Sequence, residues 1–176
     1  ELMESRGLEN PEKRPLTGIT MPTAPAGAKP LGPVASILAL TGDVERGKVA
    51  ITSCYLCHKI GRNGNDFGPN LTTFGKQQPR EVILRGILEP SADIAFGYQG
   101  SRIETVDGTI IDGIVLSSRN PVTIRSMGGT TQQVWKRRIK SITPLETSLM
   151  FSPELLGLTP QMVADITAYL QSDIER

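Results

Sequence analysis

Histidine, cysteine and aromatic residues are all scarce in this chain. Its 176 residues include one histidine and two cysteines, and 5% are aromatic. With a single histidine, no pair of imidazoles can bind one metal ion, and a four-ligand zinc site would need carboxylates to complete it. So few aromatic side chains also leave little apolar area for a core. We therefore expect a bound apolar group to fill part of the interior.

The chain also lacks a strong net charge and a long apolar run. Its formal net charge is +1, with 38% hydrophobic and 21% charged residues. This near-neutral balance argues against nucleic acid as the main partner. The longest apolar stretch, near residues 34–40, is far shorter than the ~20 residues of a membrane helix. We expect no transmembrane segment in this chain.

The scarce residues are concentrated in one short stretch, Cys54-Tyr55-Leu56-Cys57-His58, which contains both cysteines and the only histidine. Two cysteines separated by two residues and followed by histidine form the attachment motif of a c-type haem. Each thiol adds across one vinyl group of the porphyrin, and the histidine binds the iron. The sequence therefore predicts one haem c, attached through Cys54 and Cys57, with His58 as the proximal ligand. The weaker alternatives are a zinc site, a thioredoxin-like redox pair and two inert core cysteines.

Attachment of a c-type haem takes place outside the cytoplasmic membrane. We therefore expect a periplasmic or otherwise extracytoplasmic protein. No charged-then-apolar secretory segment follows Glu1. Glu1 is then expected to be a cut end, either a mature terminus or the start of an excised domain.

The second nitrogen of a metal-bound imidazole needs a hydrogen-bond acceptor that fixes the ring. Gly68-Pro69-Asn70-Leu71 follows the motif, and the rigid backbone of proline suits this role. We predict that the Pro69 carbonyl is the acceptor. The alternative is that these residues form a simple turn.

The second axial position of the iron requires another residue, and the chain contains five methionines. Met3 and Met21 lie in a proline-rich stretch, and Met162 fits a helical apolar stripe. Met127 lies beside a glycine pair at an expected hairpin tip. Met150 lies in an expected loop before the last helix and is the preferred distal ligand. A lysine ligand or an open position remains the alternative.

The composition divides the chain into three parts. Residues 1–40 are rich in proline and are expected to form a linker or an arm, lying on the domain surface or on a partner domain. Residues 41–98 and 144–176 are expected to form the haem domain. Residues 99–143 are expected to form an inserted antiparallel β subdomain.

Three helices are expected in the haem domain. The first is capped by Asp43 and runs toward Cys54, the second begins after Pro79, and the third is capped by Thr159. Gly47 lies inside the first helix and suggests that the last helix crosses there at short distance, although a tolerated glycine is nearly as plausible.

From Gln99 onward the apolar pattern changes from helical to strand-like. Turn sequences at Asp107-Gly108, Asn120-Pro121 and Gly128-Gly129 separate the expected strands. We predict an antiparallel meander of four or five strands, with approximate bounds 102–106, 109–117, 122–125, 131–135 and 138–142.

Two sets of basic residues are candidates for functional contacts. Lys136, Arg137, Arg138 and Lys140 form a run that suits docking of an acidic redox partner, although charges on the solvent face of an edge strand are the commoner case. Arg80 and Arg85 are candidates for binding the haem propionates, with solvated surface as the alternative.

The order of these motifs resembles class I cytochrome c: the cysteine-histidine motif, Gly68-Pro69-Asn70-Leu71, and Met150 before a final helix. Further stretches resemble the haem domain found at the C-terminal ends of large exported planctomycete-type proteins. They are Ile87-Leu88-Glu89-Pro90-Ser91-Ala92, Phe96-Gly97-Tyr98, Thr105-Val106-Asp107-Gly108 and Ser148-Leu149-Met150.

This resemblance covers about residues 41–172. It implies an α+β fold with a mainly helical cytochrome c core, about three helices around one haem, and an inserted small antiparallel β-sheet. It also implies thioethers at Cys54 and Cys57, His58 and Met150 as the iron ligands, and Pro69 as the imidazole's partner. Relatives usually have proline after this methionine, where this chain has Phe151. Fused sugar or alcohol dehydrogenase-like domains are common in the family, which implies an electron donor of that kind.

Three functions follow from these observations. The preferred one is a non-enzymatic electron carrier, which exchanges single electrons with a redox partner protein or a fused dehydrogenase-like domain. The second is a haem enzyme or a gas or redox sensor with an open distal site. The third treats the β insertion as a binding module that is carried by the haem domain.

Overall fold

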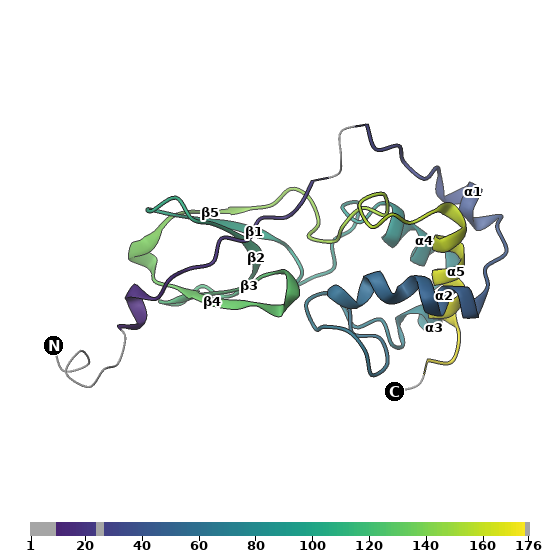
Figure 1. Ribbon diagram of the computed structural model, residues 1–176, viewed down its shortest axis with the longest axis horizontal. Coiled ribbons are helices and arrows are strands. Elements are labelled where there is room, and N and C mark those ends of the chain that lie inside the picture. The colour runs from purple at the N-terminus through teal and green to yellow at the C-terminus, as the bar shows by residue number, and fades with distance from the viewer. Residues whose placement is uncertain (1–9, 24–26, 175–176) are drawn as a thin grey trace.

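The structure is a computed structural model that describes residues 10–23 and 27–174. In Figure 1 a β-sheet lies at one end of the molecule and the helices lie at the other. The described residues form an α+β fold with a five-stranded antiparallel sheet and five α-helices, of which only α2, α4 and α5 have seven or more residues. The prediction of a mainly helical cytochrome c core is therefore wrong.

The helices are short because turn-forming residues interrupt them. Residues 57–73, between η3 and α3, and residues 89–100 and 145–159, between helices and the sheet, are mainly loops. Their glycines and prolines do not favour continuous helix. The α-helices are α1 (Val34–Leu38), α2 (Val44–Ala50), α3 (Phe74–Gln77), α4 (Arg80–Leu88) and α5 (Pro160–Gln171).

The first expected helix stops before it reaches Cys54. Asp43 does cap α2, and its side chain accepts a hydrogen bond from the Arg46 amide at 2.8 Å. After Ala50 the chain tightens into the 3-10 helix η3 (Ile51–Leu56). The Thr52 hydroxyl donates to the Val49 carbonyl at 2.9 Å, a competing bond typical of threonine near a helix end.

Helices α2 and α5 cross at very short distance, as Gly47 suggested. A β-carbon at Gly47 would lie 2.0 Å from the Asp165 carbonyl oxygen and 2.8 Å from Cβ of Tyr169. Gly42, just before α2, makes a similar approach to the Ala164 carbonyl oxygen, at 2.3 Å. Only residues without a side chain allow this contact, so the glycines fix where the two helices meet.

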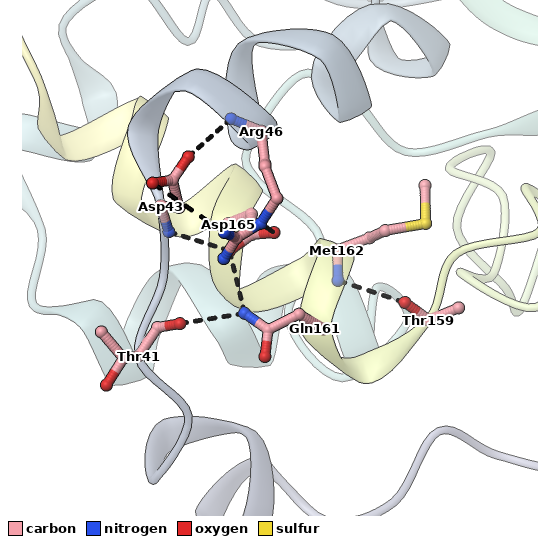
Figure 2. Close-up of polar contacts among 7 residues, drawn as sticks. All are labelled: Thr41, Asp43, Arg46, Thr159, Gln161, Met162 and Asp165. Atoms are coloured by element: carbon pink, nitrogen blue, oxygen red, sulfur yellow. Dashed lines mark hydrogen bonds and ion pairs between the residues drawn. The ribbon is translucent and has the colours of Figure 1, made fainter.

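A buried carboxylate joins the same two helices (Figure 2). Asp165, on α5, accepts hydrogen bonds from Arg46 Nε at 2.8 Å and Nη2 at 2.9 Å, from the Asp43 amide at 2.8 Å and from Gln161 at 2.9 Å. Gln161 also donates to the Thr41 carbonyl at 2.9 Å. The Arg46 hydrogen bonds outweigh the effect of burial and lower the pKa of Asp165 to about 2.

The sheet contains the predicted strands at nearly the predicted positions: β1 (Ser101–Thr105), β2 (Ile110–Ser117), β3 (Val122–Arg125), β4 (Thr131–Val134) and β5 (Ile139–Pro144). Their spatial order is β4-β3-β2-β1-β5. The fifth strand therefore pairs with β1 rather than with β4, and the prediction of a simple meander is wrong. The 3-10 helix η5 (Lys136–Arg138) redirects the chain between β4 and β5.

Residues 10–23 of the proline-rich stretch pack against the chain's own sheet, whereas residues 31–40 pack against the helical core. Ile19 forms a parallel bridge with Ile111 of β2; its amide donates to the Ile110 carbonyl at 3.0 Å and its carbonyl accepts from the Asp112 amide at 2.7 Å. The side chain of Leu16 contacts the sheet's apolar core. Met3 and the other residues before Asn10 lie outside the described residues.

The basic run supports this packing, because several of its charges are paired within the chain. Arg137 forms an ion pair with Glu12, and Arg138 donates to the Arg14 carbonyl at 2.8 Å and to Asp107 at 3.1 Å. Lys140 pairs with Glu104 at 2.6 Å. These contacts favour a structural role for the run over a docking patch.

Candidate haem site

The cysteine-histidine motif lies at the end of η3 and is closed into a loop by main-chain hydrogen bonds. The His58 amide donates to the Cys54 carbonyl at 2.8 Å, and the amides of Phe67 and Gly68 both donate to the Cys57 carbonyl, at 3.0 and 2.6 Å. These bonds bring the 67–69 segment back over the motif.

The ring of His58 is held by this returning segment. Its Nδ1 lies 2.7 Å from the Pro69 carbonyl oxygen, as predicted, and a β-carbon at Gly68 would lie 2.7 Å from Cε1 of the ring. The side chain is 8% exposed. Burial lowers the pKa of His58, although the Pro69 hydrogen bond works in the opposite direction. A neutral imidazole that donates from Nδ1 leaves Nε2 to bind a metal.

Cys54 and Cys57 are free, half-buried thiols. Burial raises the pKa of Cys54, and burial together with the neighbouring Cys54 raises the pKa of Cys57 to about 11. Without a neighbouring cation, thiols of this kind stay protonated at neutral pH, unlike the low-pKa thiolates of reactive redox pairs. Over residues 10–23 and 27–174, no three His, Cys, Asp or Glu side chains are grouped to hold a metal ion, so the zinc alternative has no support there.

Two adjoining cavities surround the motif. The larger has a cavity volume of about 240 Å³, slightly below the ~300–1,000 Å³ of typical ligand pockets. Cys57, His58 and Met150 border both cavities, and Cys54 borders the smaller one. The walls of the larger cavity are mainly apolar; they include Phe67, Leu71, Phe74, Ile83, Ile87, Ile94, Ile114, Leu149 and Leu170.

Gly86 leaves open space beside α4 at the border of the larger cavity. It borders the larger cavity, and a β-carbon built on it would meet no atom of the chain within 4 Å. Glycine inside a helix lowers its stability by ~1 kcal/mol relative to alanine. At Gly47 a neighbouring main-chain oxygen leaves no room for a side chain, but no such contact exists at Gly86. The site therefore fits a haem: an apolar cavity, an oriented imidazole, two nearby thiols and a thioether.

Among the methionines of the described residues, Met150 is the one that borders both cavities. Its amide is fixed by a hydrogen bond to the Ser148 hydroxyl at 3.0 Å. Met21 and Met127 pack beside a cluster of Phe67, Ile114 and Leu149. Met162 packs against the helical core, as expected.

Sequence reasoning missed the contribution of the sheet to this site. Ile114 of β2 borders the larger cavity and, with Phe67 and Leu149, forms a buried cluster between sheet and helices. Ile114 lies on the opposite face of β2 from the core residue Ile111. The sequence does not indicate which part of the chain covers that second face.

The two arginines that we considered for the propionates make other contacts: Arg80 donates to the Leu40 carbonyl at 2.5 Å and Arg85 pairs with Glu89 at 3.4 Å.

No family model and no curated protein sequence matches this chain. In the described part of the chain, no helix has the length and apolarity needed to cross a membrane.

Proposed function

We propose that this chain is a c-type haem protein that carries single electrons. The haem would be attached through Cys54 and Cys57, with His58 and Met150 as its axial ligands. The observation that carries the proposal is the position of these four side chains: His58, Met150 and Cys57 border both cavities, and Cys54 borders the smaller one. The ordered motifs that resemble class I cytochrome c are consistent with it.

The protein's part in this function is to hold the iron ligands and to exclude water. The Pro69 carbonyl fixes the imidazole and increases its basicity. Burial lowers the pKa of His58 and so favours the neutral imidazole, the state that binds metals. The apolar walls provide a low dielectric around the cofactor, and the sheet adds Ile114 to those walls.

A bound haem supplies one-electron chemistry. Ligation by histidine and methionine raises the reduction potential and occupies both axial positions, which leaves no position for a substrate. This supports a carrier rather than an enzyme or a sensor. The expected partners are a redox protein or a fused dehydrogenase-like domain, in an extracytoplasmic compartment where the haem is attached.

Production in cells that attach c-type haem tests the proposal. We expect one covalently bound haem per chain by intact mass, and a redox titration that follows a single one-electron step. Cys54→Ser together with Cys57→Ser removes the covalent attachment, whereas Thr52→Ser, beside the motif, retains it. A wild-type protein without covalent haem under these conditions contradicts the proposal.

A further inference from the structure

Arg125 lies on the face of the sheet that is directed toward the cavity. It is the last residue of β3 and pairs with Ile114 of β2. Opposite residues of an antiparallel pair point to the same face, and Ile114 borders the larger cavity. Met127, two residues further on, packs beside Phe67 and Leu149, which also border it.

One donor of the Arg125 guanidinium lacks a partner. Its Nε is buried and makes no hydrogen bond, and no ion pair joins the side chain to an acid of the described residues. Other arginines of the same sheet are paired: Arg102 with Asp112 at 2.7 Å and Arg138 with Asp107 at 3.1 Å. A buried charged donor without an acceptor is unfavourable and rare in native proteins.

An anion supplied by a ligand would satisfy this group. Adjacent strands lie ~4.8 Å apart, so an arginine side chain on β3 is long enough to extend past Ile114 to the cavity edge. Arginine is also well suited to carboxylates, because it can donate two parallel hydrogen bonds. A haem has two propionate carboxylates.

We propose that Arg125 binds a haem propionate, and that the β-sheet thereby contributes an ionic contact to the haem site as well as an apolar wall. This inference rests on the proposed function. Arg125 thus takes the role that the sequence suggested for Arg80 and Arg85. The guanidinium groups of those two arginines contact the Leu40 carbonyl and Glu89 instead.

A positive charge beside a propionate has a measurable consequence. It favours the ferrous state, because reduction lowers the net positive charge of the iron centre. Loss of this charge should therefore lower the midpoint potential. A residue that only stabilises the sheet would not shift the potential of a correctly folded protein in this way.

The test is spectroelectrochemistry of the haem-loaded protein and of three variants. We expect Arg125→Gln to lower the midpoint potential, Arg125→Lys to have an intermediate value, and Arg119→Gln to match the wild type. Arg119 is the matched control, because it is an exposed arginine in the β2–β3 turn of the same sheet. Equal potentials for Arg125→Gln and Arg119→Gln would overturn the inference while leaving the proposed function intact.

A crystal structure of the haem-loaded wild type gives a second readout that does not depend on the stability of a variant. We expect the Arg125 guanidinium within hydrogen-bond distance of a propionate oxygen. A guanidinium directed away from both propionates would overturn the inference. A wild type without haem would instead overturn the proposed function and the inference together.

Discussion

The imidazole of His58 is oriented by Pro69, since Nδ1 and the Pro69 carbonyl oxygen lie 2.7 Å apart. Nδ1 is the donor in this pair, and Nε2 is left available to a metal, which is the haem iron in our proposal. The contact joins the residue after the second cysteine to a loop that returns to the motif through the amides of Phe67 and Gly68. Main-chain hydrogen bonds thus give the sequence motif a geometry that suits the proposed haem ligation.

Replacement of Pro69 by glycine is expected to raise the midpoint potential without loss of haem. Glycine retains the carbonyl but relaxes the backbone, so the hydrogen bond to the imidazole weakens and the ligand becomes a poorer electron donor to ferric iron. Spectroelectrochemistry measures the potential. Pro33→Gly, at an exposed proline before α1, is the control, and equal shifts in the two variants would contradict this role of Pro69.

Gly86 is expected to be essential for haem loading. A leucine at this position would project into the larger cavity, where a β-carbon meets no atom within 4 Å, and would occupy the space of the cofactor. We expect Gly86→Leu to reduce the haem-to-protein ratio several-fold. Glu81→Leu, at an exposed position on another face of the same helix, should load normally. Full loading of Gly86→Leu would show that the haem does not lie against α4.

Gly47 is expected to tolerate no side chain. A β-carbon there would lie 2.0 Å from a main-chain oxygen of α5, so Gly47→Ala should destabilise the protein by at least ~1–3 kcal/mol, despite the better helix propensity of alanine. Lys48→Ala, on the exposed side of α2, should change stability by less than ~0.5 kcal/mol. Urea denaturation followed by circular dichroism measures both. Similar stabilities would contradict the close crossing.

Asp165 is expected to contribute to stability in a pH-dependent manner. Because its pKa is lowered from 3.8 to about 2, its contribution is present above about pH 4 and is lost as the pH falls toward 2. We expect Asp165→Asn to destabilise the protein at pH 7 by ~1–3 kcal/mol and to reduce the steepness of acid unfolding.

Asp173→Asn is the matched control for this prediction. The Asp173 side chain is 99% exposed and pairs with Lys76 at the surface, and such pairs contribute ~0–1 kcal/mol. Denaturation curves at pH 7 and pH 3 compare the variants. An Asp165→Asn protein as stable as the wild type at both pH values would show that the buried ion pair does not stabilise the α2–α5 contact.

Local features of the fold were predictable from the sequence. The turns at Asp107-Gly108 and Gly128-Gly129 separate strands that lie within two residues of their expected bounds. Asp43 and Thr159 cap helices α2 and α5 as expected. These features depend on neighbouring residues, so the chain carries their signals directly.

Features that depend on distant contacts were not predictable. The helical content was overestimated because the resemblance implied a helical core, while the residues between the motifs form loops. The pairing of β5 with β1 depends on how η5 turns the chain. In the site, the Pro69 contact followed from sequence, whereas the positions of Ile114 and Arg125 depend on how the sheet packs against the cavity.

The most direct test of the central claim is the optical spectrum of the ferric protein, with Met150→Ala and Met127→Ala as the compared variants. A sulfur-to-iron charge-transfer band in the far red is expected for the wild type and for Met127→Ala, and its loss is expected for Met150→Ala. A colourless protein, a high-spin ferric spectrum in the wild type, or a band that survives in Met150→Ala would contradict ligation of one iron by His58 and Met150.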